Sequence, residues 1–297
     1  MKSWRERVQE GATPDYLDES AADAFVSEIK RRAGEPRPMK SKEESDAQER
    51  EHELKERAHA AEVRRAAIPG ALRAAGVPER IIIEMRRHDG FFRADTPPHV
   101  REMADLASAG RSLYLHGSAG AGKSHLAAVA MWKRIDAKIA KVASDLSVTD
   151  GEDLYDVERK LSVGLGWVEW SLLLRSLREG QRDGTAEELA DKAATVRWLV
   201  LDDISAVAHL TPFAVQELTD IIRARWNANL TTVMTANMSL ISLASMINGH
   251  LQRAGFSTEE SASLSEPVVS RMRGMAGGGE DVVALDGPDL RDKREKL

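Results

Sequence analysis

One stretch of the sequence combines glycines, a lysine and a serine at a spacing that suits phosphate binding. Residues 117–124 read GSAGAGKS, match G-x-x-x-x-G-K-[ST], and lie between an apolar run and a helical stretch at 125–135. Backbone N–H groups and the start of the helix favour phosphate there, with Lys123 at the β- and γ-phosphates of ATP and Ser124 on Mg²⁺. The predicted nucleotide contacts are Gly117, Ser118, Ala119, Gly120, Ala121, Gly122, Lys123, Ser124 and His125.

Two adjacent carboxylates form the second chemical feature. The apolar run WLVL that begins at Trp198 ends in Asp202 and Asp203. A carboxylate at the end of such a strand holds Mg²⁺ in P-loop proteins, so Asp202 joins Ser124 as a predicted metal ligand. Asp203 can act as general base on the attacking water. Without the glycine-rich loop, the same pattern is also typical of a strand capped by turn-forming Asp residues.

A third polar residue follows another β-branched run. Residues 231–237 read TTVMTAN and end in Asn237. An amide at this place can orient a water between Asp203 and the γ-phosphate. The alternative is a turn Asn that precedes a helix starting near Ser239. The neighbouring motifs favour the first interpretation.

Elements that could position these residues begin after Ile68. Short apolar runs alternate there with helical patterns, which is typical of a parallel α/β sheet. The predicted strands are 112–116, 166–170, 197–201, 231–235 and 281–285. The polar segments 141–164 and 248–265 are predicted to be surface insertions. Trp167 and Trp170 flank the second strand and are more typical of a core than of base stacking.

Residues 1–66 differ in composition and predict a charged helical module. Leu17, Ala21, Phe25 and Ile29 recur at four-residue steps and would form a narrow apolar stripe. Residues 34–42 contain two prolines and predict a linker. The following segment is either a solvated arm or a partner-binding helix, and the sequence leaves both open.

Composition excludes several classes of function. The chain has no cysteine, which excludes disulfides, thiolate zinc sites and a cysteine nucleophile, and favours a cytoplasmic location. No window is apolar over the roughly 18 residues that a membrane span needs. The net charge of -6 gives no overall basic field, so contact with nucleic acid would need a local patch or assembly.

Together the motifs resemble those of AAA+ ATPases, most closely helicase loaders of the DnaC type and the related IstB-like transposition ATPases. The resemblance covers residues 68–291. GSAGAGKSHLA and WLVLDDIS are motifs of P-loop ATPases in general, and TAN follows them. EPVVSRMRG from Glu266 and GPDLR from Gly287 carry the loader-like part.

The resemblance implies further site residues. Arg271 would be an arginine finger that reaches the γ-phosphate of a neighbouring subunit, with Arg273 as the alternative, and Arg291 would be the second sensor arginine. Only six residues follow Arg291, so no C-terminal lid domain is expected. Residues 81–92 are a candidate for the adenine pocket.

We therefore expect an α/β fold: a P-loop NTPase (AAA+) core over 68–297 with a five-stranded parallel sheet and flanking helices, preceded by a smaller helical module. The expected function is that of an ATP-dependent replicative helicase loader. It would bind the helicase through residues 1–66, contact single-stranded DNA, and hydrolyse ATP with Mg²⁺ as a homo-oligomer. The alternatives are an IstB-like transposition helper and a nucleotide-gated DNA-binding switch with little turnover; Asp203 and Asn237 speak against the switch.

Overall fold

The computed structural model describes residues 23–24, 27, 42–87, 91–92, 96–142, 154–180, 185–205 and 211–285. The chain divides into two compact units, Met1–Lys55 and Glu56–Leu297. The division falls within helix α3 (Lys42–Ala66). The predicted apolar stripe (Leu17, Ala21, Phe25 and Ile29) lies outside the described residues, as does the predicted linker apart from Lys42.

In the first unit, the part of α3 before the division carries an ion pair between Glu51 and Lys55 (2.7 Å, i,i+4). Both side chains are exposed, so the pair contributes only a few tenths of a kcal/mol to the stability of the helix. Nothing in this pair identifies a partner.

The second unit is built on a five-stranded parallel sheet with the order β2-β3-β4-β1-β5. Each predicted strand is confirmed to within one residue at both ends. The carboxyl ends of parallel strands meet at one edge, so β1, β3 and β4 bring their last residues together there. The strands are β1 (Leu113–His116), β2 (Leu165–Glu169), β3 (Trp198–Asp202), β4 (Thr231–Ala236) and β5 (Val282–Ala284).

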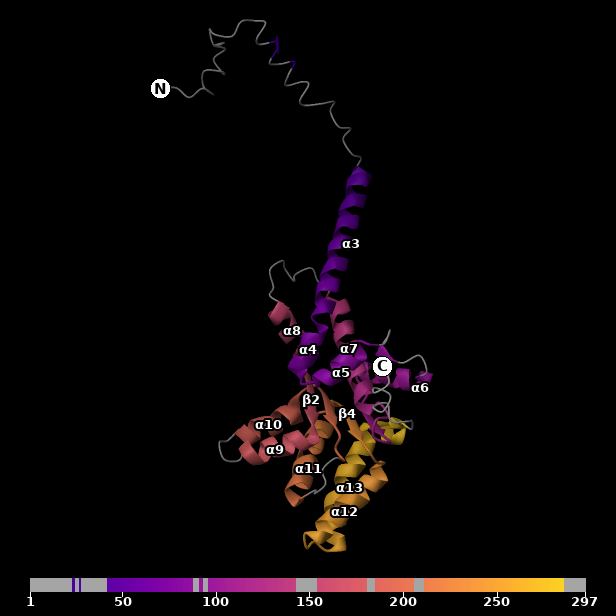
Figure 1. The fold of residues 1–297 in the computed structure, drawn as a ribbon, viewed down its shortest axis with the longest axis vertical. Coiled ribbons are helices and arrows are strands. Elements are labelled where there is room, and N and C mark those ends of the chain that lie inside the picture. The colour runs from indigo at the N-terminus through magenta and orange to yellow at the C-terminus, as the bar shows by residue number, and fades with distance from the viewer. Residues whose placement is uncertain are drawn as a thin grey trace, which may run out of the picture. The chain divides into compact units, whose positions relative to one another are not determined.

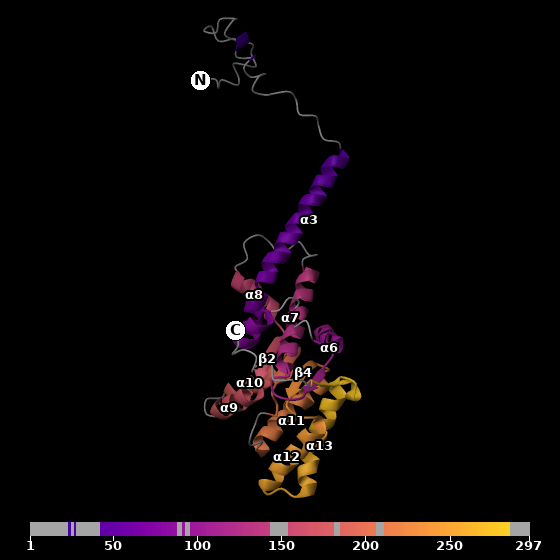
Figure 2. The ribbon, with the colours of Figure 1, turned by 45° about the vertical axis from the view of Figure 1, so that its right-hand side comes forward.

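Helices cover both faces of the sheet (Figures 1 and 2). Side chains alternate along β1: Leu113 and Leu115 belong to the core with α4 to α7, and Tyr114 belongs to the core with α9 to α13. The helices of the second unit are α4 (Ile68–Ala75), α5 (Glu79–Met85), α6 (Pro98–Ala109), α7 (Lys123–Val142), α8 (Leu154–Ser162), α9 (Trp170–Gly180), α10 (Thr185–Thr195), α11 (Pro212–Asn227), α12 (Leu240–Arg253) and α13 (Thr258–Met275), with a 3-10 turn at Gly277–Gly279.

The segment 248–265 lies at the surface as predicted, with only Leu251, Ser261 and Ser265 buried, but it has regular structure. This segment forms the end of α12 and the start of α13, which pack against each other. Ser257 and Glu260 form a capping box that starts α13, so Ser257 is a helix-start signal. Ser265 is buried and its hydroxyl donates to Asn248 Oδ1 (2.6 Å), which satisfies these polar groups between the two helices.

The segment 141–164 also contains more regular structure than predicted. Its first two residues end α7, and α8 packs against α4 with Leu161 buried. Residues 143–153 lie outside the described residues. Trp167 and Trp170 are buried, at 6% and 0% exposed, which confirms their interpretation as core residues.

A fully buried arginine joins the elements at the amino-terminal edge of the sheet. Arg225 on α11 donates to the carbonyl oxygens of Ala193, Val196 and Thr231 and to Thr232 Oγ1, at 2.7 to 2.9 Å. Burial lowers the pKa of this guanidinium to about 10. Because its donors reach α10, the turn before β3 and the start of β4, Arg225 fixes these strands at the edge opposite the predicted site.

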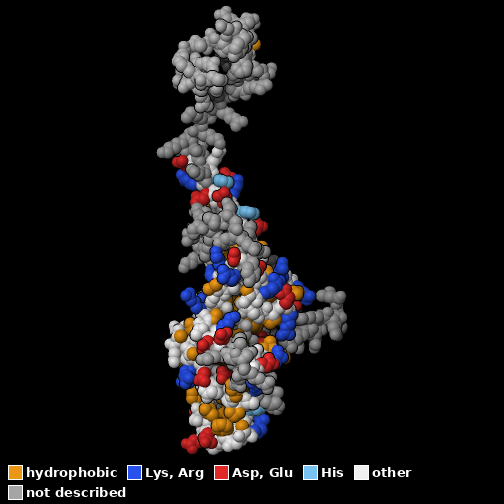
Figure 3. Space-filling model, turned by 90° about the vertical axis from the view of Figure 1, so that its left-hand side faces the viewer, with side chains coloured by type: hydrophobic (Ala, Val, Ile, Leu, Met, Phe, Trp, Pro, Cys, Tyr) orange, Lys and Arg blue, Asp and Glu red, His pale blue; other side chains and the backbone are white. Residues whose placement is uncertain are grey.

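The surface of the second unit carries both signs of charge. Lys and Arg side chains alternate with Asp and Glu side chains over the described part of the face seen in Figure 3. That pattern agrees with the small net charge of the chain. Among the described residues, no helix combines the length and apolar character that crossing a membrane requires.

Candidate nucleotide-binding site

The glycine-rich loop joins the end of β1 to the start of α7. Gly117, Gly120 and Gly122 have φ values of 139°, 78° and 92°, a backbone region that other residues rarely adopt. At Gly117 a Cβ atom would also lie 2.1 Å from the carbonyl oxygen of Leu285. Glycine is therefore required there both by conformation and by the close approach of the chain after β5.

Lys123 begins α7 and is largely buried, with 8% of its surface exposed. Its Nζ donates to the carbonyl oxygens of Gly117 (2.9 Å) and Ser118 (2.7 Å). Both acceptors are backbone carbonyls, and they hold the ammonium over the loop. A cation at a helix start beside glycine-rich backbone favours a phosphate.

Asp202 ends β3 and is 4% exposed. Its Oδ1 accepts hydrogen bonds from Ser124 Oγ (2.8 Å) and Thr235 Oγ1 (2.6 Å). Burial raises the pKa of Asp202, the two hydroxyl donors act against that rise, and the carboxylates of Asp203 and Glu169 add to it. The structure thus brings together the two predicted metal ligands, Ser124 and Asp202.

Asp203 and Asn237 also meet at this edge of the sheet. Asn237 Nδ2 donates to Asp203 Oδ1 (3.2 Å), and Ser205 Oγ donates to the same oxygen at 3.4 Å. Ser205 Oγ in turn accepts from the backbone N–H of Asn237 (2.6 Å). Asp203 has a positive φ of 55°, which turns the chain away from the line of β3. The turn gives Asp203 a direction different from that of the buried Asp202.

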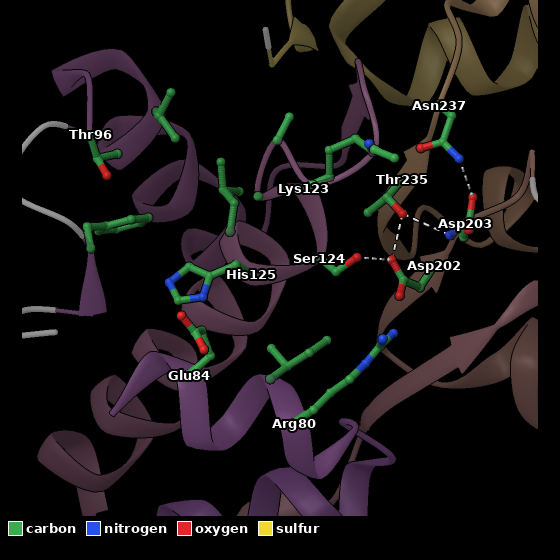
Figure 4. Close-up of a pocket in the computed structure, with 18 of the residues that line it drawn as sticks. Arg80, Glu84, Thr96, Lys123, Ser124, His125, Asp202, Asp203, Thr235 and Asn237 are labelled. Carbon is green, nitrogen blue, oxygen red and sulfur yellow. Dashed lines mark hydrogen bonds between the residues drawn. The ribbon is translucent and has the colours of Figure 1, made fainter. Parts of the chain in front are cut away.

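These groups line one cavity of about 410 Å³ (Figure 4). The loop residues 119–125 form one wall, and Asp202, Asp203 and Asn237 lie beside it. Ile81 and Phe92 line the cavity too, so both ends of the segment proposed for adenine reach it. Clefts of this size that combine an apolar wall with a few polar groups suit a small ligand.

His125 lies between the loop and the proposed base end of the cavity. Its Nε2 lies 2.6 Å from the carbonyl oxygen of Phe91, and its ring contacts Phe92 edge to face. Figure 4 shows Glu84 beside the same imidazole. His125 therefore helps to hold the 91–92 segment against α7.

Among the cavity residues that no sequence motif singles out as part of the site are Thr235, Glu169 and Arg80. Thr235 Oγ1 donates to Asp202 Oδ1 and accepts from the backbone N–H of Asp203 (2.8 Å), so it connects these two residues. Glu169 ends β2 and is paired in register with Asp202. A polar residue at the end of a predicted strand is the sequence signal that could have identified it as a cavity residue. Arg80 lines the cavity from α5 and points toward Asp202 in Figure 4, and no sequence pattern marks it.

Of the predicted arginines, Arg271 and Arg273 are described and do not line this cavity. Arg271 lies on α13, where its Nη1 donates to the carbonyl oxygen of Pro267 (3.2 Å), and it is not among the described residues that line the cavity. Arg273 is exposed on the same helix. Arg291 lies outside the described residues.

The donor set fits Mg²⁺ only together with a nucleotide. Ser124 and Asp202 offer oxygen ligands, which Mg²⁺ prefers, and this ion commonly takes its remaining ligands from water and phosphate. Within the described part of the chain, no three His, Cys, Asp or Glu side chains are grouped so as to hold a metal ion. The two oxygens therefore suit an ion that arrives with phosphate.

No protein-family model and no curated protein matches the chain. Solved structures do. DnaI is 21% identical, with 72% of this chain and 94% of that chain covered and a TM-score of 0.47. A DnaC helicase loader is 18% identical (64% and 86% covered, TM-score 0.38). A primosome component from Streptococcus pyogenes serotype M3 is 18% identical (75% and 96% covered, TM-score 0.42).

The class of the protein follows from its own sheet and loop. A parallel sheet of this order, with the glycine-rich loop between its central β1 and α7, is the P-loop NTPase fold of AAA+ type that the sequence predicts.

The site predicts that Lys123→Ala impairs nucleotide binding without unfolding the protein. Charge-assisted bonds to phosphate contribute about 3 kcal/mol, so affinity for ATP should fall about a hundredfold or more. Titration with a fluorescent ATP analogue measures the affinity, and thermal unfolding checks the fold. Lys133→Ala is the matched control. It removes another ammonium of α7, one that is paired with Asp105 on α6. Unchanged affinity in Lys123→Ala would contradict the assignment of the loop.

Proposed function

We propose that this chain is an ATPase of AAA+ type. The proposal is carried by one observation: the glycine-rich loop with Lys123, the Ser124–Asp202 pair and the Asp203–Asn237 pair line a single cavity. Phosphate binding, a metal-ligand pair and a base beside a polar amide are the parts that phosphoryl transfer to water needs.

The residues divide the work as follows. Lys123 and the loop N–H groups bind the phosphates. Ser124 and Asp202 would hold Mg²⁺ together with the nucleotide, and the ion would supply positive charge against the phosphates. Asp203 accepts a proton from the attacking water, and Asn237 fixes the Asp203 carboxylate through its Oδ1. Ile81 and Phe92 offer an apolar surface to the base.

A nucleotide-gated switch with little turnover is the rival within the same fold. A switch needs the loop and the metal ligands, but it does not need a second carboxylate held toward the cavity by an amide and a hydroxyl. Asp203 is held in that way by Asn237 and Ser205. This arrangement favours hydrolysis.

Asp203→Asn tests that choice. The variant keeps the size of the side chain and Asp202, so ATP affinity should stay within about threefold, whereas turnover should fall about a hundredfold or more because the general base is lost. Phosphate release and analogue binding are measured side by side. Asp220→Asn on α11, whose carboxylate is bonded to Arg223 away from the cavity, is the control. Near-normal turnover in Asp203→Asn would remove this residue from the mechanism and favour the switch.

Assembly is the second part of the proposal. Arg271 is partly exposed and does not line the cavity with the other described residues, which suits an arginine that acts on the nucleotide of a neighbouring copy. An arginine supplied to another subunit raises the rate on the order of a thousandfold. The active form is then a homo-oligomer, with Arg271 completing each site from the next subunit.

Mixing two inactive variants tests this arrangement. Arg271→Ala and Lys123→Ala should each be inactive, and a mixture should regain part of the activity because each supplies what the other lacks. Native mass spectrometry of the mixture checks that mixed oligomers form. The same mixing experiment is repeated with Arg273→Ala. If Arg273→Ala is inactive alone and regains activity with Lys123→Ala, while Arg271→Ala is active alone, the arginine finger is Arg273. Mixed oligomers without any recovery would argue against a finger in trans.

The cellular role that we propose is replicative helicase loading in the cytoplasm, with single-stranded DNA as a further partner. The motifs EPVVSRMRG and GPDLR support it, although the second lies outside the described residues. Helicase binding is assigned to residues 1–66, whose charged helical composition and apolar stripe set them apart in sequence from the ATPase core. Arg291 keeps its proposed place as second sensor arginine. A transposition helper with the same ATPase core is the alternative.

A shortened protein tests the helicase role. Residues 68–297, which lack the whole proposed helicase-binding module, should bind ATP within about threefold of the full chain, since every described cavity residue lies within them. Capture of the host's replicative helicase by immobilised protein should occur with the full chain and be lost with the shortened one. Equal capture by both would place the helicase contact in the ATPase unit, and no capture by either would favour the transposition helper.

A further inference from the structure

Thr235 occupies a position between the two carboxylates. It is the fifth of the six residues of β4, and it is 1% exposed. Its Oγ1 donates to Asp202 Oδ1 (2.6 Å) and accepts from the backbone N–H of Asp203 (2.8 Å), as the dashed lines in Figure 4 show. One hydroxyl therefore contacts both Asp202, the last residue of β3, and Asp203, which follows it.

Only a hydroxyl side chain can make this pair of bonds at this size. A serine or threonine oxygen both donates and accepts, whereas valine has the shape of threonine and does neither. The backbone of Thr235 is engaged as well, because its carbonyl oxygen accepts from the N–H of Ile204 (3.0 Å). The hydroxyl of Thr235 thus accepts from the N–H of Asp203, and the carbonyl oxygen of Thr235 accepts from the N–H of Ile204.

This exchange permits the turn at Asp203. The paired residues of β3 and β4 run to Leu201 and Met234, and the N–H of Asp203 then bonds to a side chain instead of to the ladder. Asp203 adopts a φ of 55°, which is sparsely populated for residues other than glycine and is tolerated best by Asn and Asp. Its carboxylate then accepts the Asn237 amide. The direction of the Asp203 side chain depends on this turn.

We propose that Thr235 is a positioning residue that sets the metal-binding carboxylate and the catalytic carboxylate with a single hydroxyl. It acts through Asp202 and Asp203, and the inference rests on the proposed ATPase function. Two donors converge on Asp202 Oδ1, and the donor from Thr235 is the one that comes from the sheet itself. Thr235 therefore holds Asp202 independently of the loop.

Thr235→Val separates positioning from binding. The turnover number kcat should fall about thirtyfold or more, because displacements of about 1 Å in a site of this kind cost up to a hundredfold. KM and analogue affinity should stay within about threefold, because the loop and Lys123 are untouched. Thr235→Ser should restore kcat to within about threefold of the original protein. Thr219→Val is the matched control, since the hydroxyl of Thr219 donates to Val215 within α11.

Hydrogen exchange gives a readout that does not depend on activity. The amide of Asp203 should exchange faster in Thr235→Val than in the original protein, and Thr235→Ser should restore its protection. Thr235→Ala is a second variant that must show the same two losses, should valine disturb the packing of β4. If kcat stays normal in Thr235→Val, or if serine fails to restore it, the positioning role is overturned.

Failure of the ATPase proposal would look different. The original protein would then release no phosphate under any condition, while exchange at Asp203 would still respond to Thr235→Val and Thr235→Ser. Unchanged exchange in Thr235→Val would overturn the link between Thr235 and Asp203, whatever the activity of the original protein.

Discussion

The site depends on the two hydroxyl groups that donate to Asp202 Oδ1. Ser124 comes from the first turn of α7, Thr235 comes from β4, and Asp202 itself ends β3. Three elements that are far apart in the sequence are therefore joined at one buried oxygen. Because burial disfavours a charged carboxylate, the two donors are also what allows an acidic group to sit there.

The other groups of the site are arranged around this oxygen. The loop can approach β5 only because Gly117 lacks a side chain where the carbonyl of Leu285 passes. Thr235 extends the connection from Asp202 to Asp203, and Asn237 and Ser205 complete it. The carboxylates thus have different environments: Asp202 is buried and held by hydroxyls, whereas Asp203 is half-buried and bonded to an amide. Two adjacent residues of one type are thereby suited to different roles.

At the opposite edge of the sheet, Arg225 joins neighbouring elements through hydrogen bonds, as the hydroxyls of Ser124 and Thr235 do at the site. Its guanidinium satisfies three carbonyl oxygens and a threonine hydroxyl where β3 and β4 begin. Leaving such buried acceptors without donors costs about 1 to 3 kcal/mol each. The two strands that carry Asp202 and Thr235 are therefore fixed at both ends, by a cation at their start and by hydroxyls at their finish.

The sequence by itself determined the five strands, the glycine-rich loop and the Asp202, Asp203 and Asn237 positions, because each depends on local pattern: an apolar run of fixed length followed by polar residues. Tertiary structure decided what local pattern does not contain. Ser257 begins a packed helix rather than a loop, since its partner Glu260 and the buried face of α12 outweigh the polar composition. Arg80, Glu169 and Thr235 reach the cavity only because α5, β2 and β4 converge on it. Whether a threonine in a strand packs or bonds depends on what the neighbouring strand presents, and here the ends of β3 and β4 place a carboxylate and a backbone N–H against its hydroxyl.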